Sequence, residues 1–156
     1  MDENVSVHEI LDKVAKEASV KQKVKILQSY DSPSIRAVLR GAYDPTIKWL
    51  VPNSKPPYTP NEAEAWDLAP LQLGVEILKQ INKYVALRKN DQWVVSVKTQ
   101  SQTHRENMFI EFIEGLHPTE VDVVFGMINR KLPYKGLTAK LAKDAFPNLI
   151  PDGKLE

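Results

Sequence analysis

Apolar positions in the first 43 residues recur every three or four residues, which is the period of a helix with one buried face. Three such segments follow one another, at residues 7–18, 20–27 and 33–43. Ser19 precedes the second segment as an N-cap, where a side-chain oxygen accepts a free backbone N–H. Before the third, Asp31 or Ser32 supplies the cap and Pro33 fits the first turn. The pattern therefore predicts three short helices.

Proline dominates the next segment, because five of the eleven prolines lie between Pro45 and Pro60. Each proline removes an amide donor and restrains the residue before it, so no regular helix is expected. We predict an extended, rather stiff segment over residues 44–60. The aromatic residues Tyr43, Trp49 and Tyr58 either pin this segment across the helices or present an adhesive surface.

The remaining apolar residues again follow mainly helical periods. A helix is predicted from Leu71 to about Arg88, another closes at Gly115, one opens at residues 117–120, and a short one spans residues 137–147. Residues 90–98 are rich in β-branched side chains but have no clear partner strand, so helix or irregular structure is expected there. Together these patterns predict an all-α fold, one compact multi-helix domain over residues 1–156.

Length and composition are those of one folded globular domain, with 156 residues, 42% hydrophobic and 26% charged. The chain has no cysteine, which excludes disulfides, thiolate metal sites and cysteine nucleophiles. The first residues are acidic and the apolar runs are short, so neither a signal peptide nor a membrane span is expected. We expect a cytoplasmic protein, in the host cytoplasm if a phage encodes it.

Charge is nearly balanced overall, with 21 basic and 20 acidic side chains and a net charge of +1. It is unevenly distributed in the last third of the chain. After Arg105 come five acidic residues without a basic one, and then five basic residues without an acidic one: Glu106, Glu111, Glu114, Glu120 and Asp122, then Arg130, Lys131, Lys135, Lys140 and Lys143. Any electrostatic attraction to a polyanion must therefore be local.

Catalytic motifs are lacking in the sequence. His8, His104 and His117 have neither metal-ligand spacing nor a marked nucleophile. Glu111 and Glu114 fit the solvated edge of an amphipathic helix, and no glycine-rich phosphate loop occurs. We expect a non-catalytic protein with no metal and no cofactor.

The segment of residues 120–147 has the strongest chemical pattern. An amphipathic helix leads through a basic turn into a second helix whose start carries Thr138. Free amides at a helix start, a hydroxyl and flanking lysines are suited to a phosphate. The alternative is a helix hairpin whose charges only solvate its surface.

Both ends of the chain resemble a known family. The letters ASVKQKVKIL at residues 18–27, and NRKL, KGLT and AFPNLIP at residues 129–132, 135–138 and 145–151, resemble the N-terminal DNA-binding domain of ATP-dependent DNA ligases of the T-even-phage type. The resemblance implies an all-helical domain that grips the minor-groove side of nicked duplex through phosphates. The adenylated lysine of that family, in a Lys-x-Asp-Gly motif, is missing before Asp152 and Gly153. We therefore expect a freestanding binding domain that is not adenylated, rather than a ligase.

Residues 31–60 look similar to small accessory proteins of T-even-type phages, some of which are described as binding host RNA polymerase. This second resemblance implies a different function, docking on RNA polymerase or replication proteins. The residues expected to dock are Trp49, Pro56, Pro57 and Tyr58.

Two hypotheses follow from the sequence. The first is a phage accessory protein that binds duplex DNA through phosphate contacts, and the second is the docking module. The DNA-binding residues expected under the first hypothesis are Arg130, Lys131, Lys135, Gly136, Thr138, Lys140 and Lys143, with Lys21 on the early basic helix. Gly136 is expected to allow close approach of the DNA backbone, and Thr138 to present its hydroxyl.

Overall fold

The computed structural model describes residues 6–59, 81–95 and 101–151. Its first part contains the three predicted helices, α1 (Val7–Lys16), α2 (Val20–Ser29) and α3 (Pro33–Tyr43). The predicted caps are confirmed, because the Ser19 hydroxyl accepts the backbone N–H of Gln22 and the Ser32 hydroxyl accepts that of Ile35, each at 3.2 Å. Pro33 occupies the first turn of α3.

A three-stranded antiparallel sheet follows, and it overturns the all-α prediction. Its strands are β1 (Ile47–Trp49), β2 (Val85–Lys89) and β3 (Gln92–Val95), in the order β1-β2-β3. Asn90 and Asp91 form the tight turn between β2 and β3, with positive φ angles of 50° and 63°. These two residue types tolerate that conformation better than most. The fold is therefore mixed α and β.

Two local predictions fail with the all-α interpretation. Residues 81–83 form a short 3-10 helix, η2 (Ile81–Lys83), and the chain then enters β2 instead of continuing as a helix to Arg88. Within residues 90–98, Gln92–Val95 form β3 rather than a helix or irregular structure. The partner that the sequence did not reveal is β2, which itself pairs with β1 through Ile47 opposite Leu87. The rest of the helix predicted from Leu71 lies outside the described residues.

The last part of the chain contains α5 (Gln102–Glu114), α6 (Pro118–Ile128) and α7 (Ala139–Ala145), at the three places where helices were predicted. Gly115 is the residue that closes α5. His117 caps α6, since its Nδ1 accepts the backbone N–H of Thr119 at 3.2 Å. His117 therefore has a structural role at the entry to this helix.

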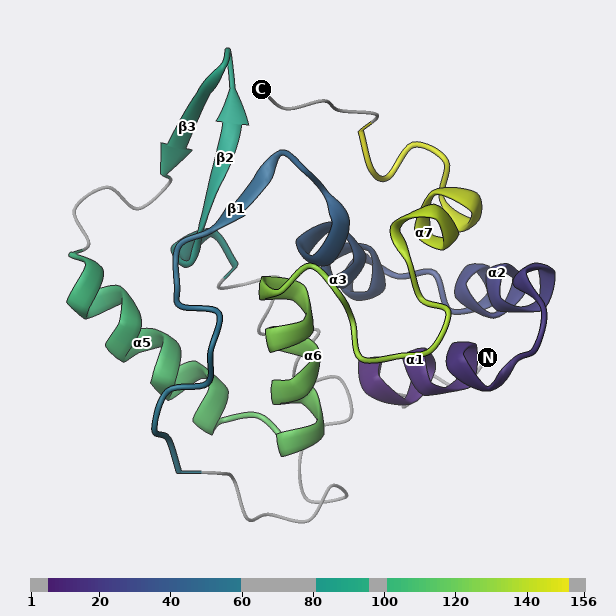
Figure 1. Ribbon diagram of the computed structural model, residues 1–156, viewed down its shortest axis with the longest axis horizontal. Coiled ribbons are helices and arrows are strands. Elements are labelled where there is room, and N and C mark those ends of the chain that lie inside the picture. Colours follow the sequence, from purple (N-terminus) through teal and green to yellow (C-terminus); the bar gives the residue numbers. More distant parts are fainter. Residues whose placement is uncertain (1–5, 60–80, 96–100, 152–156) are drawn as a thin grey trace.

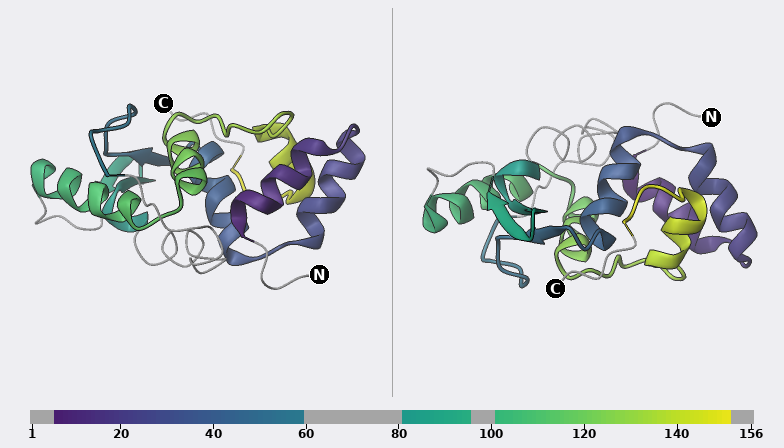
Figure 2. Two further views of the ribbon diagram at one scale, coloured as in Figure 1. Left: turned by 90° about the horizontal axis from the view of Figure 1, so that it is seen from below. Right: turned by 90° about the horizontal axis from the view of Figure 1, so that it is seen from above.

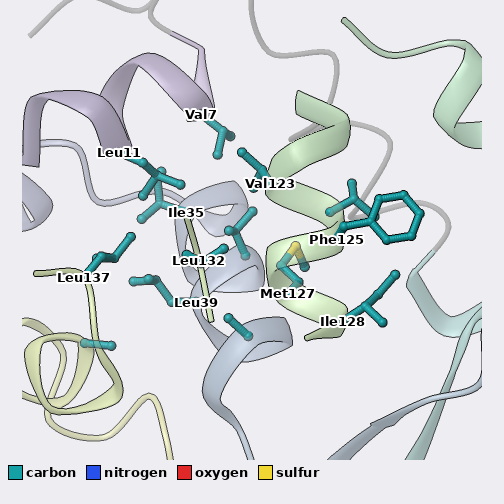
Figure 3. Close-up of a cluster of buried hydrophobic side chains, with 14 of the residues drawn as sticks. Val7, Leu11, Ile35, Leu39, Val123, Phe125, Met127, Ile128, Leu132 and Leu137 are labelled. Carbon is teal, nitrogen blue, oxygen red and sulfur yellow. The ribbon is translucent and has the colours of Figure 1, made fainter. Parts of the chain in front are cut away.

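Helix α6 lies near the centre of the molecule, with α5 and the sheet towards one end and α1, α2 and α7 towards the other (Figures 1 and 2). Eight of the eleven residues of α6 are buried. Figure 3 shows its side chains facing those of α1, α3 and the segment between α6 and α7. The labelled core residues are Val7, Leu11, Ile35, Leu39, Val123, Phe125, Met127, Ile128, Leu132 and Leu137. The core therefore connects both ends of the chain.

Residues 50–59 form a strap that runs from β1 past α5 and α6 (Figure 1). No helix forms between residues 44 and 59. The strap is bound at several points along its length: Gln102 Nε2 donates to Leu50 O at 2.9 Å, Asn129 Nδ2 to Asn53 O at 3.0 Å, Lys55 Nζ to Asp122 Oδ1 at 2.6 Å and Thr59 N to Glu114 Oε2 at 2.8 Å.

Candidate functional site

The basic segment singled out in the sequence begins where α6 ends. The backbone N–H of Arg130 donates to Met127 O at 3.1 Å, and that of Lys131 donates to Gly126 O at 2.9 Å. This pair of bonds is a Schellman motif, which ends a helix through one residue in the left-handed conformation. That residue is usually glycine, but here it is Arg130, with φ 62°. The motif turns the chain sharply away from α6.

The guanidinium of Arg130 binds the protein's own backbone. It donates to three carbonyl oxygens at the end of α3 and the start of the sheet: Gly41 O at 2.6 Å, Asp44 O, and Ile47 O at 3.0 Å. The residue is half-buried, and burial lowers the pKa of its guanidinium while nearby Asp44 opposes that shift. The side chain therefore joins α6 to α3 and β1. We leave Arg130 out of the candidate phosphate ligands.

Residues 131–138 form a loop, the basic loop, that borders an open groove of about 650 Å³. Its apolar residues Leu132 and Leu137 are buried in the core. The Tyr43 hydroxyl donates to Leu137 O at 2.7 Å and accepts the N–H of Leu132 at 3.3 Å, so it fixes both sides of the loop. Burial raises the pKa of this hydroxyl, although the bond from Leu132 opposes the shift. Lys131, just before the first anchor, and Lys135, between the two, are exposed along the groove.

The fold accounts for a glycine at position 136 without the approach of a DNA backbone. Its φ is +78°, a left-handed value, and a Cβ at this position would lie 2.8 Å from Lys23 Cε. Lys23 is only 7% exposed, and its ammonium donates to Val14 O at 2.9 Å and to Ala15 O and Lys135 O, both at 3.3 Å. The glycine therefore makes room for a buried lysine that connects α1, α2 and the basic loop.

Thr138 caps α7, since its hydroxyl accepts the N–H of Leu141 at 3.2 Å. The helix has seven residues, about two turns, and its first free amides are partly satisfied by this cap. Lys140 is 84% exposed in its side chain and forms an ion pair with Asp144 at 3.3 Å. Lys143 is partly buried near the end of the same helix. Thr138 thus stabilises the helix start, while Lys140 adds an exposed charge beside the basic loop.

Lys21 is exposed on α2. Helix α2 packs on α7, where Gln28 Nε2 donates to Ala145 O at 3.0 Å, and Lys23 of α2 contacts the loop at Lys135. The structure thus brings the early basic helix and the late basic segment, which are far apart in the sequence, to the same end of the molecule (Figure 1).

The basic loop also borders a second groove, which one carboxylate lines. This groove, of about 450 Å³, is lined by Asp122 and shares Lys131 and Tyr134 with the first. Burial, reinforced by Asp12, Asp122 and Glu120, raises the pKa of the Tyr134 hydroxyl to about 12. The tyrosine therefore stays neutral, in a groove that Lys131 and Asp122 line together.

The residues predicted to dock on a protein partner face mainly inward. Trp49 Nε1 donates to Gly41 O at 2.8 Å, and both Trp49 and Tyr58 pack against the core. Pro56 is partly buried, and Pro57 is exposed. Of the two roles considered for the aromatic residues, pinning of the segment is the one that this packing fits.

The sequence interpretation missed one exposed cluster, on the sheet. Trp93 of β3 is 38% exposed, and two cations lie beside its ring. Lys48 Nζ is 5.8 Å and Arg88 Cζ is 5.4 Å from the ring centroid. Each of the three residues comes from a different strand. The cluster could not be predicted from the sequence without the strand pairing. The Asn90-Asp91 turn between two β-rich runs could have indicated the hairpin.

Other chemistry is limited in the described residues. His8 and His117 stack with ring centroids 6.0 Å apart, at the contact between α1 and α6. Among residues 6–59, 81–95 and 101–151, no three or more potential metal ligands gather closely enough to hold an ion. Within the same part of the chain, no helix has both the length and the apolar character needed to cross a membrane.

Comparison with protein families identifies the family of the chain. A model described as a family of unknown function, DUF6433, matches residues 10–134. The matched range includes the sheet with Lys48, Arg88 and Trp93, and it ends within the basic loop at Tyr134. A search among curated proteins finds no match to the chain.

Proposed function

Because the chain belongs to the DUF6433 family, for which no function is described, its role must be inferred from its surface, and we propose that it binds duplex DNA without catalysis. The proposed ligands of the phosphates are exposed or partly exposed lysines at one end of the molecule: Lys131, Lys135, Lys140 and Lys143, with Lys21 on α2. The observation that carries the proposal is the open groove bordered by the basic loop, with Lys131 and Lys135 exposed along it.

The distribution of charge supports this location. Residues 101–129, which contain α5 and α6, carry one basic residue, Arg105, against four glutamates and Asp122. Residues 130–150 carry five basic residues against the single acid Asp144. A polyanion is therefore attracted to the end that holds α2, α7 and the basic loop, and repelled from α5 and α6.

Contacts of this kind position a duplex without reading its sequence. A lysine ammonium is a compact point charge, and phosphates are the same at every base pair. The resemblance of residues 18–27 and 129–151 to the ligase DNA-binding domain points to the same ligand, since that domain grips duplex largely through phosphates. We therefore expect little base preference.

The proposal is tested by the salt dependence of binding, measured by fluorescence anisotropy on a labelled blunt duplex. Four or five neutralised phosphates give a slope of log affinity against log salt of roughly −4. Lys131→Gln and Lys135→Gln should each make that slope shallower by about one unit. Lys89→Gln, which removes an exposed charge at the tip of the β2–β3 hairpin, is the matched control and should leave the slope unchanged.

If both loop variants bind the duplex like the parent protein, the DNA proposal fails. Docking on RNA polymerase or replication proteins is then the remaining function, and the near-neutral net charge of +1 is compatible with it. With Trp49 and Tyr58 packed on the core, such docking would have to use the exposed edge of the strap at Pro57.

A further inference from the structure

The carbonyl groups of the basic loop are hydrogen-bonded within the protein. The backbone N–H of Tyr134 donates to Leu132 O at 2.8 Å, and that of Leu137 donates to Tyr134 O at 3.1 Å. The ammonium of Lys23 donates to Lys135 O at 3.3 Å. Oxygen atoms that would repel an anion are therefore already bound by donors of the loop itself or of Lys23.

One backbone N–H of the same loop has no such partner. A peptide unit is planar and trans, so the N–H of Gly136 points opposite to the carbonyl of Lys135. That carbonyl faces the buried ammonium of Lys23, and the N–H therefore points away from it. Gly136 is exposed and lines the groove, and in the part of the chain that the structure describes its N–H has no acceptor. The loop thus presents a free amide donor on its exposed side, where the groove lies.

The surroundings of this donor are positively charged. Lys131 and Lys135 are exposed along the groove, and neither forms an ion pair with another described residue. Of the described residues that line the groove, none is an aspartate or a glutamate. Oriented backbone N–H groups beside cations bind anions, and a phosphate has enough strong acceptor oxygens to bind an amide and an ammonium together.

We propose that the N–H of Gly136 and the ammonium of Lys135 bind one phosphate group, and that Lys23 is the positioning residue that orients the peptide unit between them. Lys23 is held in turn by Val14 O at 2.9 Å and Ala15 O at 3.3 Å, so it fixes the carbonyl of Lys135 relative to α1. The inference rests on the proposed function, because the duplex backbone is one source of this phosphate, and free phosphate is the other. A neutral N–H releases no counterion, so this contact does not contribute to the salt slope and needs its own measurement.

The amide of Gly136 can be observed by itself in an NMR spectrum of the full chain. The protein is prepared with ¹⁵N in glycine and ¹³C in the lysine carbonyls, and Lys135-Gly136 is the single Lys-Gly pair among the six glycines of the sequence. A spectrum filtered for the ¹³C–¹⁵N bond therefore contains this amide alone. Titration with inorganic phosphate should move its proton signal downfield until it saturates, because the N–H gains a charged hydrogen bond. Sodium chloride at equal ionic strength should not, whereas an unlabelled blunt duplex should.

Three variants separate the roles of the lysines. Lys135→Gln should raise the phosphate concentration at half-saturation about fivefold to tenfold, because it removes the ammonium from the site. Lys23→Met should abolish the saturable shift, while the signals of Gly41 and Gly126 in the unfiltered ¹⁵N spectrum keep their parent positions. A purely structural role of Lys23 would displace those two signals as well. Lys21→Met, at an exposed position on the same helix, is the matched control and should titrate like the parent.

The phosphate site is wrong if the Gly136 amide moves with neither inorganic phosphate nor the duplex beyond the sodium chloride control. An unchanged saturable shift in folded Lys23→Met would overturn the positioning role. Failure of the duplex proposal gives a different result, in which the duplex does not bind while inorganic phosphate still moves the Gly136 signal, and the site then takes free phosphate. Duplex binding with the expected salt slope, but with the Gly136 signal in place under both probes, refutes this site alone.

Discussion

Replacing Arg130 should weaken the fold rather than act first on DNA binding. Its guanidinium donates to the carbonyls of Gly41, Asp44 and Ile47, and a hydrogen bond to a charged group contributes about 1.5–3 kcal/mol. Two of these acceptors have another donor, since Gly41 O also accepts Trp49 Nε1 and Asp44 O accepts the N–H of Ile47. Those two carbonyls keep a hydrogen-bond donor when the guanidinium is removed. The loss of unfolding free energy is therefore smaller than the sum of three such hydrogen bonds. We expect Arg130→Ala to lower the free energy of unfolding by about 2–4 kcal/mol.

The backbone conformation supplies a matched comparison at the same position. Arg130 is the left-handed residue of the Schellman motif, with φ 62°, and a side chain there costs roughly 1 kcal/mol relative to glycine. Arg130→Gly also removes the guanidinium but relieves this strain, so it should be more stable than Arg130→Ala by about 1 kcal/mol. Arg130→Lys keeps the charge but loses the planar fork, and it should also be destabilised.

Urea unfolding of the full chain, followed by far-UV circular dichroism, measures these differences. The comparison requires that the change of unfolding free energy with urea concentration is the same for all variants. The order expected for stability is parent, then glycine variant, then alanine variant. If Arg130→Ala and Arg130→Lys unfold within about 0.5 kcal/mol of the parent, the carbonyl contacts do not stabilise the fold and this reasoning is wrong.

Two further predictions concern buried polar groups. Lys23→Met keeps most of the side-chain volume but removes the ammonium from three backbone carbonyls. It should therefore lower the free energy of unfolding, measured in urea, by about 1–3 kcal/mol. Lys21→Met, at an exposed position on the same helix, is the control and should change that free energy by less than about 0.5 kcal/mol. Burial, aided by the charge of His117 and opposed by Glu9 and Asp12, lowers the pKa of His8, so the unfolded chain takes up the proton first and stability falls as the pH drops below about 6.5. The melting temperature of His8→Gln should therefore fall less between pH 7.5 and pH 5 than that of the parent, while the exposed-site control His104→Gln should follow the parent.

The helices could be predicted because their signals are local. Apolar spacing and a capping residue lie within or beside the element itself, and the hydroxyls of Ser19 and Ser32 make the expected caps. Thr138, expected to present its hydroxyl to a phosphate, also acts as a cap. The sheet could not be predicted in the same way, since β1 and β2 are separated by residues 50–84 and their pairing leaves no local pattern. Only the Asn90-Asp91 turn carries local information, and it indicates a hairpin. The helical period predicts a helix before this turn, and the missing partner strand favours helix or irregular structure after it.

Prediction of the candidate site from the sequence is limited in a similar way. Sequence identifies a basic residue but not the direction of its side chain. Arg130 and Lys131 are adjacent, yet the first is bound to backbone carbonyls and the second is exposed along the groove. Lys23 and Lys21 differ in the same way on α2. Composition therefore located the basic end of the molecule, while the backbone acceptors within reach determine which cations remain for a ligand.

Because Arg130 is bound to backbone carbonyls while the neighbouring lysines are exposed, the DNA affinity of an Arg130 variant is a decisive measurement. A stable domain has about 5–15 kcal/mol of unfolding free energy, so a loss of 4 kcal/mol from the lower limit still leaves roughly five-sixths of Arg130→Ala molecules folded. Unfolding alone then lowers the apparent affinity by less than about 1.5-fold. If Arg130→Ala is stable and yet binds duplex about tenfold more weakly, with a salt slope shallower by one unit, the guanidinium must leave its carbonyls to bind a phosphate. An unchanged slope assigns the arginine to the fold and confines the phosphate contacts to the exposed lysines.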